Sequence, residues 1–509
     1  MKRFVFTLVA AALVTSVAGA ASAQKSKDTL RFPLADGETA LDAYLLPGSF
    51  NNVWEPSVFD NLLGFDPKKG DYAPLLAKSW SQPQPDVYEY ELRDDVKWHD
   101  GQAFTADDVV YTINYLIDPK VKLRFKSSWE WIKSVEKLGP LKVRITSRSP
   151  RPDGMMWMAF NTPIFPKHLH EPLTDKQQFG ARPVGTGPLR VLKLDRNAGI
   201  TAEKYAGFKS MPTKHAATIG KFLSEPIPDP GTLVAKFMVG EVDVARDVSG
   251  DQVQALIDQG RAEYTLSPPA LGYSFIGFPS VGWQNVKALA DPRVRLAIIK
   301  AIDRQALVVA QYGKIGKDIH PVEGLCSKEQ LGCGYTKLTP AYDPEGAKKL
   351  LAEAGYADGF DVGISTFPSG VGEATAISGL LRAVGIRASV HPHGTAARLQ
   401  QMAQGKVDIG YYGWNGGGMF EVSGQLVRHF LTKEYDDPVL VKMAQDTTTM
   451  MNDAERREAV AQVMDYANDK SYLFPISPNR VIFTHTKEVK LNASGLRTGQ
   501  VNPHEWGWK

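Results

Sequence analysis

The sequence predicts an α/β fold in which helices cover a sheet with parallel strands. One unit recurs in the C-terminal half: an amphipathic run with helical spacing, then a glycine, then a short apolar run with strand character. Residues 374–392 and 397–414 follow this order, and residues 231–246 also place a strand after a helix. Such units build parallel α/β layers. A chain of 509 residues is long enough for two to four domains.

The N-terminus has the features of an export signal. Two cations precede an apolar stretch over residues 4–20, and Ala21-Ser22-Ala23 offers the small residues that signal peptidase requires. We expect a signal peptide over residues 1–23, cleaved before Gln24, and an exported, periplasmic protein. An N-terminal membrane anchor is the alternative. Without the two leader cations the formal net charge falls from +3 to +1, which argues against nucleic acid as a partner.

The next elements can be assigned from composition and spacing. Residues 29–32 and 141–147 have the character of short strands. Residues 53–66 are interpreted as a helix with an apolar face that ends at Gly64. Residues 291–313 predict one long amphipathic helix with a proline near its start.

Residues 88–118 predict a strand, a tight turn and a helix. Apolar and polar side chains alternate over residues 88–98, as in a half-buried strand, and Asp100-Gly101 makes the turn. Thr105 stands at the N-cap of the following helix, which Asp118-Pro119 ends. An acid–base pair of His99 and Asp100 is the functional alternative, but the turn already explains both residues.

Six segments carry a resemblance to a known family. They are "YELRDDVKWHDGQAFTADDVVYTINYLIDP", "PVGTGPLRV", "LVAKFMVGEVDVA", "DPRVRLAIIKAIDR", "YDPEGAKKLLAEAGYADGF" and "GKVDIGYYGW". In this order, over more than 300 residues, the chain resembles the extracellular solute-binding proteins of the peptide/nickel (dipeptide/oligopeptide) class, which feed ABC importers.

The resemblance implies a two-lobed periplasmic-binding-protein fold, with an extra domain inserted in the first lobe and two hinge strands. Carried over, lobe one holds residues 24–49, 184–271 and 476–509, the inserted domain residues 50–183, and lobe two residues 272–475. "GYSFIGF" and "LFPISPNRVIF" are then the hinge crossings. The family usually has an asparagine in the first crossing, where this chain has Phe275-Ile276-Gly277.

The resemblance also implies a function and its partners. The protein is expected to be a periplasmic substrate-binding receptor that closes its lobes over a peptide-like or other small polar solute. It would deliver this solute to ABC permease subunits in the inner membrane, as a monomer and without a cofactor. A binding protein that serves a chemoreceptor is an alternative that the sequence does not separate from transport.

Three clusters are expected to contact the solute, because a closing cleft needs aromatic walls and a few polar anchors. The predicted ligand-binding residues are Asn51, Asn52, Trp129, Tyr412, Trp414 and Asn415. Core packing is the alternative for each aromatic residue. Tyr411 and Tyr412 are adjacent on a strand and point to opposite faces, so at most one of them lines the cleft.

Two departures from the family constrain the ligand. Peptide-binding members place an aspartate shortly after the tryptophan that Trp414 matches, whereas the first acid here is Glu421. Dipeptide-type members carry an arginine after a strand of lobe two, and the matching loop, residues 365–374, has none. Because a buried unpaired charge costs several kcal/mol, a small zwitterionic dipeptide is disfavoured. A longer peptide, or a neutral or sugar-like solute, fits better.

Cysteine and histidine spacing supplies two further expectations. Cys326 and Cys333 are the only cysteines, and an oxidising compartment favours a disulfide between them, with two free thiols as the alternative. His391 and His393 lie two apart, on one face if they are in a strand. Two imidazoles are too few for a closed metal site, so we expect no metal there.

A secreted hydrolase that uses paired carboxylates is the rival class. The sequence has no G-x-S-x-G elbow and no H-E-x-x-H helix. Ser134 and Lys137 form a single S-x-x-K without its companion motifs. The receptor interpretation explains the leader, the near-neutral charge and the ordered segments together, so we do not expect an enzyme.

Overall fold

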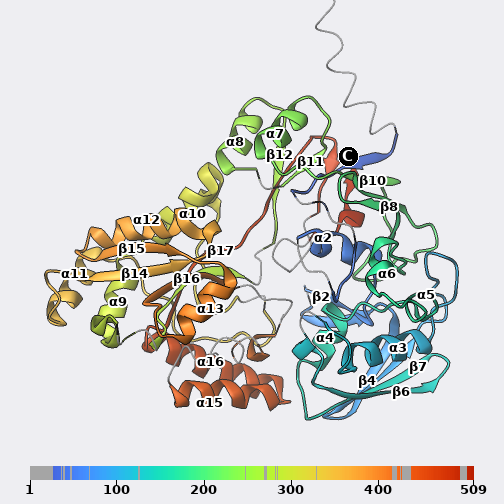
Figure 1. The fold of residues 1–509 in the computed structure, drawn as a ribbon, viewed down its shortest axis with the longest axis horizontal. Helices are drawn as coiled ribbons and strands as arrows, with labels where there is room; N and C mark the ends of the chain where they lie inside the picture. The colour runs from blue at the N-terminus through green and yellow to red at the C-terminus, as the bar shows by residue number, and fades with distance from the viewer. Residues whose placement is uncertain are drawn as a thin grey trace, which may run out of the picture.

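The chain folds into two lobes, which lie on the left and the right of Figure 1. The computed structural model describes residues 27–509 apart from 36, 38, 39, 46–48, 68, 124, 125, 247, 269–271, 281, 282, 284, 328, 329, 415–420, 425, 427–436 and 493–500. The expected signal peptide therefore lies outside the described residues. None of the helices described combines the length and the apolarity that a membrane crossing requires.

The left-hand lobe, which we call lobe two, is built on a mixed five-stranded sheet. Its strand order is β15-β14-β16-β13-β17, where β15, β14 and β16 are parallel and β13 runs antiparallel to both of its neighbours. The bounds are β13 Tyr273–Gly277, β14 Asp361–Thr366, β15 Arg387–Pro392, β16 Ile409–Trp414 and β17 Leu473–Pro478.

The predicted helix–glycine–strand units produce the parallel part of this sheet. Helices α11 (Pro344–Glu353), α12 (Val371–Arg382) and α13 (Thr395–Ala403) each precede one parallel strand. Gly385 and Gly405 lie between helix and strand with φ of 94° and 64°, a left-handed conformation in which a glycine ends a helix without a steric cost. The prediction of parallel α/β layers is confirmed.

Helices cover both faces of the sheet and bury two apolar cores. Helices α11, α12 and α9 (Pro292–Lys300) pack on one face around residues such as Ile364 and Ile409. Helices α15 (Pro438–Asp446) and α16 (Asp453–Asp469) pack on the other face, with Tyr412. Tyr411 belongs to the first core and Tyr412 to the second, as strand alternation requires.

The right-hand lobe, which we call lobe one, contains antiparallel and mixed sheets. A four-stranded sheet has the order β1-β10-β9-β8, and a second has the order β4-β5-β7-β6. The bounds are β1 Thr29–Arg31, β4 Ala77–Gln84, β5 Val87–Leu92, β6 Ile132–Gly139, β7 Lys142–Ser147, β8 Leu189–Asp195, β9 Gly199–Lys204 and β10 Lys221–Ser224. Two-stranded pairs join β2 Leu63–Asp66 to β3 Asp71–Pro74 and β19 Val489–Lys490 to β20 Gly507–Trp508. The helices are α2 Ser49–Val58, α3 Ala106–Ile117, α4 Gly154–Phe160, α5 Lys167–His170 and α6 Gln177–Ala181.

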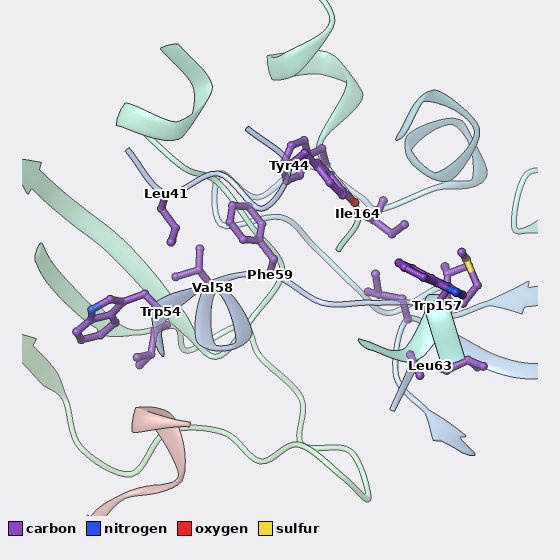
Figure 2. Packing of buried hydrophobic residues seen from close by; sticks show 14 of the residues in the cluster. Leu41, Tyr44, Trp54, Val58, Phe59, Leu63, Trp157 and Ile164 are labelled. Carbon is purple, nitrogen blue, oxygen red and sulfur yellow. The ribbon is translucent and has the colours of Figure 1, made fainter. Parts of the chain in front are cut away.

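One large apolar core runs through this lobe. Its members come from β1 and α2, from the sheet of β4 to β7 and from the C-terminal segment near Trp506. Figure 2 shows Tyr44, Trp54, Phe59 and Trp157 packing with aliphatic side chains in this core. Such interlocked aromatic packing fixes the segments that precede and follow α2.

The turn and the helix predicted for residues 88–118 are present, whereas the strand predicted over residues 88–98 is shorter and ends at Leu92. Helix α3 begins after Thr105, whose hydroxyl and backbone form a capping box with Asp108, and ends at Asp118. The ring of His99 is buried between two backbone groups, because Gly185 N–H donates to Nδ1 at 3.2 Å and Nε2 lies 2.9 Å from the Gly187 carbonyl. The turn therefore docks the helix onto the segment at residues 185–187, a structural role.

Two helix predictions are wrong in extent. Residues 291–313 form two helices, α9 and α10 (Arg304–Tyr312), because Asp303 accepts a hydrogen bond from Ala306 N–H and starts the second helix. Helix α2 ends at Val58, before Gly64. The carbonyls after it accept N–H groups from Leu76 and Ala77, and this pairing replaces further helical bonds.

In the described part of the chain, two segments connect the lobes. The first lies before the expected run 272–278, because β13 belongs to the lobe-two sheet, and the second lies within the expected run 473–483. β12 (Glu263–Leu266) leads into β13, and β17 leads into β18 (Ile482–His485), which pairs with both β12 and β11 (Val244–Ala245). The two crossings hydrogen-bond to each other: Ser267 N–H donates to the Val481 carbonyl at 2.8 Å, and Asn479 N–H donates to the Gly272 carbonyl at 3.0 Å. The connection is therefore a paired ribbon.

A smaller apolar cluster flanks the crossings. It joins α7 (Pro230–Met238) and α8 (Gly250–Asp258), at the top of Figure 1, to α10. Tyr312, at the end of α10, donates its hydroxyl to the Pro478 carbonyl at 2.9 Å and accepts Arg480 N–H at 3.0 Å. Helix α10 is therefore fixed to the second crossing.

Candidate functional site

The candidate site begins where the parallel strands of lobe two end. Ser365 and Tyr412 lie near the carboxyl ends of β14 and β16, which are adjacent and in register. Tyr412 is 8% exposed, and its hydroxyl donates to Oγ of Ser365 at 2.8 Å. Its ring meets Phe367 edge-on, with a centroid distance of 5.5 Å. In open α/β sheets ligands bind at this carboxyl edge, which makes it the candidate ligand-binding edge of lobe two.

Arg398 brings a positive charge to this edge. Its guanidinium carbon lies 4.8 Å from the centroid of the Tyr412 ring and 5.7 Å from that of Phe367. The side chain also contacts Met402, whose sulfur lies 2.9 Å from Nη1. A guanidinium packed against aromatic rings is held in one plane.

Sequence reasoning missed Arg398. It looked for an arginine in the loop after β14, whereas this one comes from the first turn of α13. The first turn of a helix that follows a parallel strand lies at the carboxyl edge of the sheet, and that rule could have identified it.

Trp414 closes β16, where its backbone pairs with Tyr273 of β13. It therefore shares the strand, and the sheet edge, with Tyr412. The side chain of Trp414 and all of Asn415 lie outside the described residues. Their expected contact with a solute stays a prediction.

The lobe-one candidates lie on two segments. Asn51 and Asn52 are in α2, where Asn52 is half-buried and the side chain of Asn51 is outside the described part. Trp129 is 5% exposed and meets Tyr44 and Trp157 edge-on, with centroid distances of 5.3 and 6.0 Å. Its Nε1 is buried without a hydrogen-bond partner among the described residues. Trp129 belongs to the apolar core of lobe one, and its expected contact with a solute stays a prediction.

Glu421, the first acid after Trp414, already has a partner inside the protein. Its Oε1 accepts from Nε of Arg456 at 3.2 Å, its Oε2 accepts from the Ser423 hydroxyl, and both charged side chains are almost fully buried. Burial raises the pKa of Glu421, and the Arg456 charge opposes that rise. Glu421 therefore serves the fold and is not available to pair with an ammonium group of a solute.

The two cysteines form a disulfide in the structure, with their Cα atoms 5.9 Å apart. The loop that they close lies next to Glu421, because Val422 N–H donates to the Leu331 carbonyl at 2.9 Å. The disulfide and the buried Glu421–Arg456 pair thus fix the segment that follows the candidate site.

Metal and catalytic alternatives find little support among the described residues. No group of three or more His, Cys, Asp or Glu side chains in that part is arranged to hold a metal ion. His391 is exposed and lies 2.8 Å from the Ser389 hydroxyl. Asp100 pairs with His168 rather than with His99. Lys137 pairs with Asp107 at 2.7 Å and lies three residues from Ser134 on β6.

Comparisons with known proteins find similarity over most of the chain. A family model for the bacterial extracellular solute-binding proteins, family 5 (middle region), matches residues 71–437. The chain is 27% identical over 426 residues to the glutathione-binding protein GsiB of Shigella dysenteriae serotype 1, which covers 80% of this chain and 78% of that protein.

Solved structures show the same fold at low identity. NikA from Brucella suis, in complex with Fe(III)-EDTA, superposes with a TM-score of 0.79 at 19% identity, over 94% of this chain and 100% of that one. DppA from Helicobacter pylori, in complex with the peptide STSA, gives a TM-score of 0.73 at 21% identity, over 95% and 99%. The two-lobed α/β fold is thereby confirmed.

Proposed function

Because the chain belongs to the bacterial extracellular solute-binding proteins of family 5, whose members are substrate-binding receptors of ABC importers rather than enzymes, we propose that it captures a carboxylate-bearing, peptide-like solute between its lobes. The observation that carries this proposal is Arg398, which lies against Tyr412 at the carboxyl edge of the parallel strands. Closure over a solute removes its charge from water. Removing a carboxylate from water costs free energy, and a planar guanidinium that pairs with the carboxylate offsets this cost better than any neutral group.

The other residues of the site limit the chemical class of the solute. We assign Tyr412, Phe367 and the predicted Trp414 to an aromatic wall of the site, and we keep Trp129 as the predicted contact from lobe one. Glu421 is already paired with Arg456, so it offers no carboxylate for an ammonium group close to Trp414. We therefore favour a solute whose carboxylate is far from any ammonium group. Glutathione, a peptide and EDTA, the ligands named for the relatives above, all carry carboxylates.

The cellular setting forms part of the same proposal. Family members act in the periplasm of Gram-negative bacteria with ABC permeases. For this chain we propose cleavage before Gln24, action as a monomer, and lobes divided at the boundaries given by the resemblance. Intact mass of the exported protein tests the cleavage, and light scattering after size exclusion tests the monomer. Service to a chemoreceptor and a hydrolase activity remain the rival functions.

Identification of the bound solute tests the function most directly. Protein purified without denaturation should release, on unfolding, a small molecule with at least one carboxylate, identified by mass spectrometry. The same compound should bind the emptied protein in calorimetry and be recovered unchanged. A solute without any acidic group would overturn the assignment of Arg398, and conversion of the solute to a product would support the rival hydrolase function.

A further inference from the structure

A pocket of about 520 Å³ lies in lobe one, formed by residues that the solute site does not use. One wall is a single face of α3, where Tyr111, Asn114, Tyr115 and Asp118 follow at helical spacing. The opposite wall is the start of α6 with Gln177. In Figure 1, α3, α5 and α6 lie together in the right-hand lobe. A volume of this size is typical of a small-molecule site.

Two tyrosine rings make the aromatic wall of the pocket, and the core behind them holds them in place. The rings of Tyr111 and Tyr115 are close to parallel, with an interplanar angle of 20° and centroids 6.4 Å apart. His170, which is fully buried, meets both rings edge-on, and its Nδ1 lies 2.5 Å from the Tyr111 hydroxyl. Phe165 and Phe179 pack against His170 in turn. The aromatic surface is therefore pre-formed.

The rim of the pocket is polar. Asn114 and Gln177 are exposed, and among the described residues neither side-chain amide has a hydrogen-bond partner. Each amide offers donors and an acceptor. The charged lining residues balance in sign, since they comprise two aspartates, Asp118 and Asp175, and two lysines, Lys122 and Lys176. The Lys176 ammonium already binds the carbonyls of His170 and Glu171, at 2.7 and 2.9 Å.

We propose that this pocket binds a neutral, polyhydroxylated ring, such as a monosaccharide or a short oligosaccharide. The C–H face of a sugar ring packs on aromatic side chains, while its hydroxyls both donate to and accept from amides and carboxylates. The balanced charges give no preference for an anion or a cation. A purely apolar ligand would cover the rim amides without satisfying them, at a cost.

Saturation-transfer NMR on the full mature protein tests this site, with D-glucose, N-acetyl-D-glucosamine and maltose as probes. At least one sugar should receive saturation, mainly on its ring C–H protons. A variant with both Asn114→Ala and Gln177→Ala should raise the dissociation constant about tenfold or more, since each lost neutral hydrogen bond costs roughly a factor of five. Gln178→Ala, an exposed neighbour outside the pocket, is the matched control and should bind as the wild type does.

The Arg398→Ala variant separates this proposal from the proposed function. The sugar signal should persist in that variant, because Arg398 belongs to the other lobe. Loss of the signal there would place the sugar in the solute site and overturn the second pocket. Absence of saturation for all three sugars, or equal affinity in the double variant and the wild type, would overturn it as well. Melting temperatures of all variants confirm that each one is folded.

Discussion

The hydroxyl of Tyr412 donates to Oγ of Ser365 across the neighbouring parallel strands β16 and β14, at 2.8 Å. This bond fixes the tilt of the Tyr412 ring. As a result, the guanidinium of Arg398 packs against a tyrosine ring whose hydroxyl is held in place, at the edge of the sheet.

Replacement of Trp414 tests the aromatic wall. Trp414→Ala should weaken solute binding roughly tenfold or more, because stacking and burial of an indole in a closed site contribute at least about 1.4 kcal/mol. Calorimetry gives the affinity and thermal unfolding gives the stability. Trp508→Ala, on β20, is the matched control and should bind normally. Unchanged affinity with a large fall in melting temperature would instead make Trp414 a core residue.

Variants of Arg398 test the ligand charge. Arg398→Ala should weaken binding of a carboxylate solute by roughly 2 kcal/mol, about 30-fold, since a charge-assisted hydrogen bond is lost in a site closed to water. The affinity of Arg398→Lys should lie between those of Arg398→Ala and the wild type, because lysine keeps the charge but lacks the planar group that stacks on Tyr412. Arg382→Ala, an exposed arginine at the end of α12, is the control. Equal affinity of all three variants for the solute would contradict the role of Arg398.

The disulfide is tested by thiol labelling. Unfolded protein that has not been reduced should show no reactive cysteine. With a sequence separation of 7, the loss of the link should lower the free energy of unfolding by about 2 kcal/mol. The double variant Cys326→Ala with Cys333→Ala should match reduced wild type in urea unfolding. Two reactive thiols per chain before reduction would refute the pairing.

Acid should destabilise the fold through His99. Burial lowers the pKa of His99 from 6.5 to about 4, although the hydrogen bond to the Gly187 carbonyl opposes the shift. The unfolded chain therefore takes up a proton at a higher pH than the folded one. The stability that this histidine contributes is complete above pH 6.5 and is lost as the pH falls toward 4, by roughly 2 kcal/mol between pH 7.5 and 5.

Urea unfolding at several pH values measures this effect. His99→Gln should be less stable than the wild type at pH 7.5, because Gly185 N–H loses its acceptor, yet it should lose less stability on acidification. Part of the pH dependence should remain, since burial also lowers the pKa of His170 to about 4. His391→Gln, an exposed histidine, is the control. An identical pH slope in His99→Gln and wild type would count against the explanation.

The elements that the sequence predicted well are those specified locally. The unit from α12 through Gly385 to β15 is fixed by helical spacing, a glycine with positive φ and a β-rich run, all within about twenty residues. The capping of α3 by Thr105 and Asp108 is equally local. The break between α9 and α10 was missed because the apolar spacing continues across it and Asp303 alone marks it.

The parts of the site that escaped prediction depend on tertiary contacts. Arg398 is on α13, the helix that connects β15 to β16, and it contacts Tyr412 on β16. No spacing rule within a single helix or strand predicts such a contact. Glu421 is the first acid after Trp414 in the sequence, but its pairing with Arg456 on α16 is a tertiary contact. Trp129 lies against Tyr44, a contact between segments far apart in the chain. Sequence signals therefore predicted candidate residues without giving the contacts that surround them.

The ribbon formed by the two crossings has a mechanical consequence. Ser267 and Val481, and Gly272 and Asn479, are joined by backbone hydrogen bonds, and Tyr312 holds the far side of the second strand. Two strands linked in this way resist sliding past each other but bend together, so the lobes should have essentially one degree of freedom. Distances between dye pairs placed across the lobes should then change in fixed proportion to one another, whichever solute drives the change.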